Sequence, residues 1–412
     1  MSRLILRHAT LLDGLNPPRP EMTLVIDGER LHSVDSGQVE AAPGDQVFDL
    51  KGMTVMPGMI NTHYHATYQD IGPGALPVGM EAPPALQTLR AARNLKRALD
   101  AGFTGVISAG APYAIDAGCK QAIAEGLMEG PRIVAGSRDV STTGHCQDWW
   151  QWHWGPGSSA QTHIVDGPDA FRRAIREEVK RGAEIIKIFA TAGHAVPGVV
   201  GKMDLDEDEL RTAIDTAHSR GARIRAHIAN RETILTAARL GIDVIDHADG
   251  LDEECIAAVL AKGIFVVPSM LYVSRVVEYF SGEWKSHHQQ ELEKMHRILP
   301  IANGAGVKLT LGDDFGALPL SHGSYADELE YYVNEVGIPP LDVIRWATVH
   351  GAEMMGMGHE LGQLKPGFLA DLVIVDGDPL VDISCIKGDR GLKGVVKGGR
   401  FVHHQLGPGG SA

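Results

Sequence analysis

Residues 54–65 read TVMPGMINTHYH, and this stretch bears on both the fold and the chemistry of the chain. Its apolar residues predict a buried strand that ends with His63 and His65. Because side chains alternate along a strand, residues two apart point to the same side, so the two imidazoles face one point. Imidazole is a good ligand for a borderline-soft divalent ion such as zinc. The stretch therefore predicts a metal site at the end of a strand.

Further metal-type residues follow at the ends of other predicted strands. They are Lys187 in EIIKIFATAG, His227 in RIRAHIAN, His247 in VIDHADG and the pair Asp313 and Asp314 in LTLGDDFG. Together with the His-x-His motif, this pattern indicates a metal-dependent hydrolase.

The middle of the chain alternates apolar strands with helical segments. Eight strands are predicted near TVMPGMINTHYH, FTGVISA, RIVAGS, EIIKIFA, RIRAHIA, DVIDHA, FVVPSM and VKLTLGD. Between them lie helical patterns such as DAFRRAIREEVKRGA, where Phe171, Ile175 and Val179 recur at four-residue spacing. Eight βα units predict an α/β protein with a (β/α)₈ (TIM) barrel, whose active site lies at the carboxyl ends of the strands. The candidate residues all fall there or just beyond.

Both ends of the chain are predicted to be rich in strands. The segments RLILRHATLL and MTLVIDGERLHSVD come first, and Asp27-Gly28 is a typical hairpin turn. Near the other end, Gly398-Gly399 marks a second hairpin. Because chain termini often lie close together, we expect residues 1–56 and 360–412 to form one composite β-sandwich domain, with the barrel at 57–359.

Composition narrows the class of protein. The chain has 412 residues, 44% of them hydrophobic and 22% charged, with a net charge of −14, so a nucleic-acid partner is not expected. Four scattered cysteines, Cys119, Cys146, Cys255 and Cys385, favour a reducing compartment. No secretory leader or membrane span is evident. We expect a cytoplasmic homo-oligomer that acts on a small molecule and does not bind membranes.

The chain resembles the metal-dependent amidohydrolase superfamily, and within it the branch of imidazolonepropionase-like proteins and Xaa-Pro or Xaa-Arg dipeptidases. The similarity runs nearly end to end. Its most specific segments are PGMINTHYH, TTGHCQD, GAEIIKIFATAG, RAHIAN, IDHADG, LGDDFG and LGQLKPGFLADLVIVDGDP. The resemblance implies a hydrolytic site with one or two divalent ions, usually zinc, inside the barrel.

The resemblance also implies a role for each candidate residue. One ion would be held by His63, His65 and Asp314, and the second by His227 and His247. Lys187 would react with carbon dioxide and bridge the two ions as a carbamate, since a free ammonium offers no lone pair to a metal. Asp314 fits the family pattern better than Asp313, which is the alternative.

The implied reaction is hydrolysis of a C–N amide bond by a metal-bridged hydroxide. Asp314 would take a proton from the water and pass it to the leaving nitrogen, as base and then acid. His145, in TTGHCQD, would hydrogen-bond the substrate carbonyl. The expected substrates are N-acyl amino acids, dipeptides or aromatic amides. Dipeptides fit less well, because Met203 and Leu205 stand where many peptidase-like members carry an aromatic residue.

Two loops carry additional candidates. The segment CQDWWQWHWGPG holds four tryptophans, and Trp150 and Trp152 would form an aromatic wall for the substrate or, alternatively, a contact with another subunit. His322, in PLSHGSYADE, would line the pocket or remain an ordinary loop residue. The same alternatives apply to His194.

Two other classes of function stay open. The first is a mononuclear deaminase or cyclic-amide hydrolase on the same fold, although such relatives usually lack a bridging lysine. The second is a non-catalytic scaffold of amidohydrolase fold, which would typically have lost metal ligands. Ion stoichiometry separates these alternatives.

Overall fold

Two sets of strands organise the chain, and each belongs mainly to its own unit. The computed structural model describes residues 2–37, 39–71, 79–145, 147–148, 161–192 and 203–407. One unit contains residues 1–61, 96–105 and 323–412, and the second contains residues 62–95 and 106–322. The predicted domains 1–56 with 360–412 and 57–359 stay a prediction.

Both ends of the chain contribute to the eight-stranded sheet of the first unit. Its order is β18-β17-β16-β5-β1-β2-β3, with β4 beside β1. The strands are β1 (Leu4–Leu11), β2 (Arg19–Asp27), β3 (Arg30–Asp35), β4 (Gln46–Asp49), β5 (Thr54–Pro57), β16 (Leu372–Val375), β17 (Leu392–Lys397) and β18 (Arg400–His404). Strand β16 runs antiparallel to β5 and so joins the two ends, as the sequence predicts.

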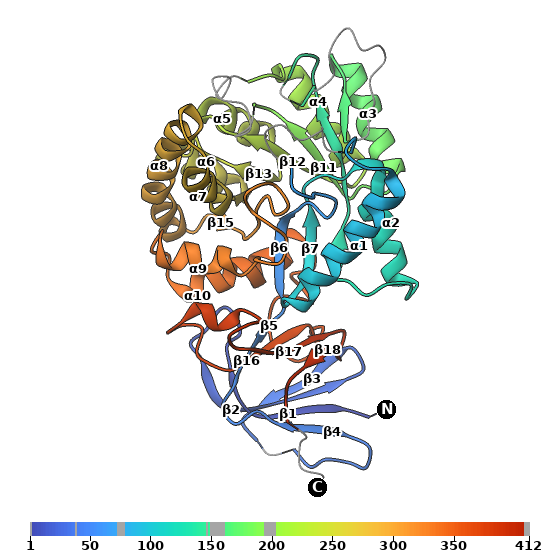
Figure 1. Cartoon of the computed structure of the whole chain (residues 1–412), viewed down its shortest axis with the longest axis vertical. Helices are drawn as coiled ribbons and strands as arrows, with labels where there is room; N and C mark the ends of the chain where they lie inside the picture. Colours follow the sequence, from blue (N-terminus) through green and yellow to red (C-terminus); the bar gives the residue numbers. More distant parts are fainter. Residues whose placement is uncertain are drawn as a thin grey trace. The chain divides into compact units, whose positions relative to one another are not determined.

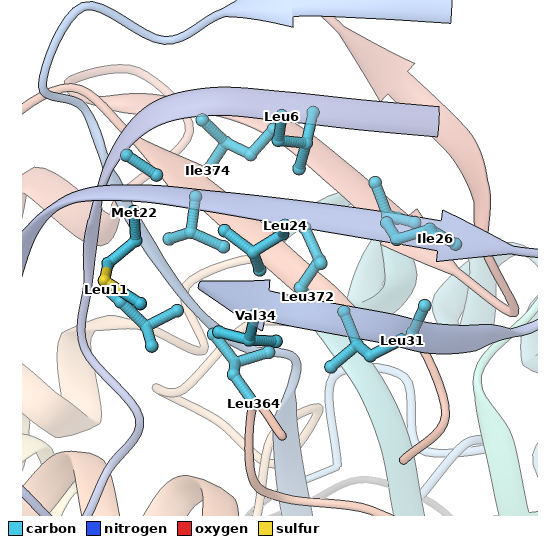
Figure 2. Close-up of a cluster of buried hydrophobic side chains, with 14 of the residues drawn as sticks. Leu6, Leu11, Met22, Leu24, Ile26, Leu31, Val34, Leu364, Leu372 and Ile374 are labelled. Carbon is cyan, nitrogen blue, oxygen red and sulfur yellow. The ribbon is translucent and has the colours of Figure 1, made fainter. Parts of the chain in front are cut away.

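The two predicted hairpins are present in this sheet and lie against each other. Strands β2 and β3 pair around Asp27-Gly28, and β17 and β18 pair around Gly398-Gly399. A Cβ atom at Gly399, where φ is +74°, would lie 2.0 Å from the Gly28 carbonyl oxygen, so only glycine fits there. Apolar side chains from both ends of the chain share one core in this unit, including Leu6, Leu24 and Ile374 (Figure 2).

The second unit contains a seven-stranded parallel sheet. Its order is β10-β9-β11-β12-β13-β14-β15. The strands are β9 (Gly136–Ser141), β10 (Thr162–Ile164), β11 (Ile185–Phe189), β12 (Arg223–Ile228), β13 (Val244–His247), β14 (Phe265–Val267) and β15 (Lys308–Leu309). From β11 onward each strand pairs in parallel with the next along the chain, which is the order that successive βα units produce. Strand β10 was not predicted.

Helices connect the parallel strands. They are α2 (Ile115–Ala124), α3 (Pro168–Lys180), α4 (Glu207–Ser219), α5 (Arg231–Leu240), α6 (Glu253–Lys262), α7 (Met270–Tyr279) and α8 (Glu283–Ala305), and α3 to α6 lie outside the strands (Figure 1). Asp206 and Glu209 form a capping box at the start of α4. Gly241 ends α5 in the left-handed conformation, which favours glycine.

A smaller sheet has the order β6-β7-β8 and completes the set of eight predicted strands. Its strands are β6 (Met59–Tyr64), β7 (Phe103–Ser108) and β8 (Arg132–Val134), with α1 (Pro84–Asp100) between β6 and β7. The remaining helices are α9 (Asp327–Asn334), α10 (Pro340–Arg345) and α11 (Gly351–Met354), with single turns at Pro112–Ala114, Trp346–His350 and Ile383–Ile386.

The chain is thus an α/β protein with a parallel-sheet core and a separate, mainly antiparallel sheet from its termini. Hydrogen bonds extend across the core from β6. The Thr62 amide donates to the Leu311 carbonyl (2.7 Å), and Arg225 Nη1 donates to the carbonyls of Thr62 (2.8 Å) and Ser108 (3.1 Å). Among the described residues, every helix is too short or too polar to cross a membrane.

Candidate metal and active site

The candidate residues lie at the carboxyl ends of core strands or directly after them. His63 lies near the end of β6 and His65 just past it. The others belong to later strands: Lys187 to β11, His227 to β12, and His247 to the last position of β13, while Asp314 follows β15. The histidines and Lys187 are buried, whereas 17% of the Asp314 side chain is exposed. Topology therefore brings residues from distant parts of the sequence to one edge of the core.

Asp314 is the point on which the first two histidines converge. Its Oδ1 atom lies 3.1 Å from His63 Nε2 and 3.3 Å from His65 Nε2. Burial by itself would raise the pKa of the Asp314 carboxyl, but the His63 and His65 imidazoles outweigh it and hold that pKa well below its usual range. Burial also lowers the pKa of His65 to about 4. The cluster is therefore an anionic carboxylate facing two imidazoles.

Asp313 points to different partners. Its Oδ2 accepts from the backbone amide of Tyr272 (3.0 Å) in the first turn of α7, and its Oδ1 accepts from the Asp314 amide (2.8 Å). Burial, and then the charge of Asp314, raise the pKa of Asp313. Asp313 thus satisfies an amide at a helix start, and Asp314 is the aspartate that faces the histidines.

The remaining histidines close the cluster. The His63 and His247 rings have centroids 5.1 Å apart, and those of His227 and His247 are 4.3 Å apart. Ligand atoms of His63, His247 and Asp314 all lie within 4.8 Å of one another. His227 stacks on Phe189, with centroids 5.0 Å apart and an interplanar angle of 9°. These contacts link the first histidine motif to the side chains of β12 and β13.

Lys187 belongs to a buried charge network that the sequence did not predict. Its Nζ lies 2.7 Å from Asp246 Oδ2, and Arg225 Nε donates to the same oxygen at 3.0 Å. Arg225 Nη2 also donates to Asp246 Oδ1. Burial would raise the pKa of Asp246, but Arg225 and Lys187 hold it well below its usual range. Charged residues inside the apolar strands RIRAHIA and DVIDHA were the available signal, because buried charges are almost always paired.

This network reaches the first histidine and a second aspartate. His63 Nδ1 lies 3.2 Å from Asp246 Oδ1 and 3.1 Å from Arg225 Nη2. On the other side of Lys187, the paired residue of β9 is Asp139. Burial raises the pKa of Asp139 to about 6, although Lys187 partly offsets it.

His145 lies beside the cluster and is held by an aspartate that the sequence did not single out. Its Nε2 lies 2.7 Å from Asp204 Oδ2, and its Nδ1 accepts from the Gln147 amide at 3.3 Å. Nε2 therefore carries the proton and donates it to Asp204. Its ring is 5.8 Å from Phe189, the residue that stacks on His227. Burial lowers the pKa of His145, and Asp204 works against that shift.

The loop candidates fall into two groups. His322 Nε2 lies 3.2 Å from the carbonyl oxygen of Tyr68, whose ring stacks on His65 at a centroid distance of 3.8 Å. His322 thus contacts the backbone of a residue that packs on the site. Trp150, Trp152 and His194 lie outside the described residues.

Comparison with known proteins identifies the family. The family model described as Amidohydrolase family matches residues 54–402. The chain belongs to the amidohydrolase family. This family is metal-dependent, and its members are hydrolases that act on amide and other C–N bonds.

Three proteins show which amidohydrolases this chain is similar to. Ochratoxinase from Aspergillus niger is 28% identical over 391 residues, which cover 86% of this chain and 77% of the relative. Imidazolonepropionase from Cutibacterium acnes is 25% identical over 407 residues, covering 92% and 90%. The crystal structure of a prolidase complexed with N-methylphosphonate-L-proline is 30% identical, has a TM-score of 0.88 and covers 98% of this chain and 100% of that one.

The side chains of this amidohydrolase fit a divalent ion. In a tetrahedral zinc site with bonds of about 2.0–2.1 Å, neighbouring ligand atoms lie roughly 3.3 Å apart. The separations of 3.1 Å and 3.3 Å between Asp314 Oδ1 and the two Nε2 atoms match that spacing. Asp246 can accept a hydrogen bond from His63 Nδ1. The other ring nitrogen, Nε2, is then free of a proton and can bind the ion. The donor set and an outer carboxylate are therefore both in place.

Proposed function

We propose that this amidohydrolase hydrolyses a C–N amide bond of a small molecule at a binuclear metal site, with zinc as the most suitable ion. The observation that carries the proposal is the convergence of His63 and His65 on Asp314 Oδ1. Buried histidines that surround one carboxylate oxygen at ligand spacing are typical of a metal centre. Family membership supports both the metal and the class of bond.

The proposal extends to the architecture around the site. The parallel strands would close into a (β/α)₈ barrel, and the sheet of the termini would form a β-sandwich. The bonds from Thr62 to Leu311 and from Arg225 to the Thr62 and Ser108 carbonyls support closure. They connect β6 and β7 of the smaller sheet with β12 and with the residues directly after β15.

Six residues would hold two ions. His63, His65 and Asp314 would bind one ion, and His227 and His247 the other, with Lys187 bridging as a carbamate. To take that form, Lys187 would have to give up its ion pair with Asp246. Asp246 already receives hydrogen bonds from Arg225 to both of its oxygens, so it keeps a cationic partner when the lysine loses its charge.

Divalent ions at these positions would supply Lewis acidity and lower the pKa of an attacking water. The chain supplies the rest of the chemistry. Asp314, whose carboxylate is anionic, accepts the proton of the water and delivers it to the leaving nitrogen. His145, fixed by Asp204, holds the substrate carbonyl through its Nε2 proton once substrate replaces that aspartate as its partner.

The substrate class that we propose first is an N-acyl amino acid or a dipeptide. The prolidase structure with N-methylphosphonate-L-proline supports it, because that similarity covers both chains almost entirely. A neutral aromatic amide is the second candidate. Tyr68 stacks on His65 and Phe189 on His227, so aromatic faces flank the imidazoles. Trp150 and Trp152 would extend that aromatic wall or contact another subunit in a homo-oligomer.

A substrate screen with metal analysis tests the proposed function. Zinc-loaded protein would be assayed against N-acyl amino acids, dipeptides, aryl amides, cyclic amides and aminopurines, and metal content would be measured on the same sample. We expect release of an amine from acyclic amides, with activity that disappears after chelation and returns with zinc. Turnover of aminopurines or cyclic amides alone would favour the deaminase or cyclic-amide alternative. Absence of metal and of any turnover would favour the scaffold.

A further inference from the structure

A second group of metal-type side chains lies on α8, apart from the six proposed ligands. It consists of His287, His288 and Glu291, and we call it the α8 cluster. His287 Nε2 lies 2.9 Å from Glu291 Oε1, and His288 Nδ1 lies 2.8 Å from Glu291 Oε2. Each oxygen of the Glu291 carboxylate therefore contacts a different imidazole.

The helix fixes this geometry. Residues three and four apart lie on one face of a helix, so Glu291 is adjacent to both histidines although they are consecutive in sequence. The two rings have centroids 5.3 Å apart. Ligand atoms of all three residues lie within 4.8 Å of one another. Small changes in side-chain torsions would bring them to the spacing of ligands around one ion.

Burial separates this cluster from an ordinary ion pair on the surface. The side chain of His288 is 1% exposed and that of Glu291 is 12% exposed, while His287 retains 33%. Buried side chains lose little further conformational entropy when an ion binds. By contrast, the His218–Asp243 pair is 40% and 30% exposed and has one histidine for its carboxylate.

We propose that the α8 cluster is a second metal site that binds one borderline-soft divalent ion, with zinc as the best match. Two imidazoles and one carboxylate form a donor set that zinc uses in sites with an open coordination position. Water would occupy what the three side chains leave open. The ion would link the second and third turns of α8 and stabilise that part of the helix. This site does not depend on the proposed hydrolytic centre, since the two share no residue.

Counting ions tests the proposal. The full-length protein would be equilibrated in a zinc buffer, and bound zinc would be measured for the wild type, Glu291→Gln, His287→Ala and the control His218→Ala. We expect Glu291→Gln and His287→Ala to bind one ion fewer than the wild type, and His218→Ala to bind the same number. Loss of a direct ligand should weaken zinc binding at this site by more than the roughly 10–100-fold that outer-shell changes cost.

The zinc-dependent shift in Tm distinguishes loss of the site from poor folding of a variant. Zinc should raise the Tm of the wild type and of His218→Ala more than that of His287→Ala, whose substitution lies at the most exposed member of the cluster. Equal zinc counts in the wild type and both cluster variants, or equal zinc-dependent shifts in Tm, would show that the cluster is only a pair of His–Glu contacts. Amide hydrolysis should be unchanged in the cluster variants, so failure here leaves the hydrolytic proposal intact.

Discussion

The ammonium of Lys187 lies 2.7 Å from the carboxylate of Asp246, and both side chains are buried. Arg225 donates to both oxygens of the same carboxylate. Asp139 is the residue of β9 paired with Lys187, so two cations and two acidic side chains lie close together inside the core. The proposed carbamate of Lys187 would give up this ion pair, and Arg225 would remain as the cationic partner of Asp246.

Replacement of Lys187 by alanine should abolish most hydrolysis. We expect kcat to fall by at least about 100-fold, the upper end of what outer-shell changes cost a metal site. Acetate or propionate should restore part of the activity by supplying the missing carboxylate. The matched control is Lys120→Ala, since Lys120 forms an exposed pair with Glu184. Wild-type turnover in Lys187→Ala would exclude the bridging role.

The two adjacent aspartates should respond differently. Asp314→Asn should lower kcat by ~10²–10⁴-fold, because a positioned acid–base group contributes that much. Asp313→Asn should have a milder effect on kcat and show instead as a lower Tm, since Asp313 accepts from the Tyr272 amide at the start of α7. Steady-state kinetics and thermal unfolding of both variants check this. A larger loss of kcat at Asp313 would reverse the assignment.

The sequence could predict which of the two aspartates, Asp313 or Asp314, faces the histidines. The family pattern favoured Asp314, and the structure places its carboxylate against His63 and His65. The histidine motif and the eight strands follow from local pattern, and the pairing of the two chain ends follows from the tendency of chain termini to lie close together. Strand alternation and hairpin turns act over a few residues, so they can be read from the sequence.

The partners of these residues could not be predicted in the same way. Arg225 contacts Asp246 because β12 and β13 are neighbouring strands. Asp204 contacts His145 although the two residues are far apart in the sequence. Which charges pair inside a core depends on strand order and on side-chain direction across neighbouring strands. The sequence shows only that such buried charges need partners.

Arg225 should matter for stability as well as for the site. Arg225→Met would leave the Thr62 and Ser108 carbonyls without this donor and weaken the neutralisation of Asp246. Breaking a buried ion pair typically costs about 3–5 kcal/mol. The exposed pair of Arg239 with Glu207 is the control, and Arg239→Met should change the free energy of unfolding much less than Arg225→Met does. Urea unfolding that shows similar losses for both variants would contradict the structural role of Arg225.

The buried pair of Arg138 with Glu178 predicts sensitivity to acid. Burial by itself would raise the pKa of Glu178, but hydrogen bonds from His163 and Arg138 lower it to about 2. A depressed folded pKa stabilises the native state above the unfolded pKa of about 4.5 and ceases to do so as the pH falls towards 2. The contribution of Glu178 to the free energy of unfolding should therefore drop by roughly 2–3 kcal/mol across that range.

Glu178→Gln isolates this contribution. The variant should be less stable than the wild type at pH 7, and the difference should shrink between pH 4.5 and pH 2, because glutamine cannot titrate. Urea unfolding at several pH values measures it. A difference that stays constant over the whole range would mean that Glu178 is not the titrating group.

The number of ions lost when the histidine cluster is disrupted tests the metal-site proposal most directly. Zinc content and amide hydrolysis would be measured on the same samples of the wild type and of a His63→Ala/His247→Ala variant, which lacks one ligand for each proposed ion. The proposal predicts that the variant binds two fewer ions per chain and shows no detectable hydrolysis. Equal zinc content in both proteins, or hydrolysis by the wild type after complete removal of its metal, would contradict it.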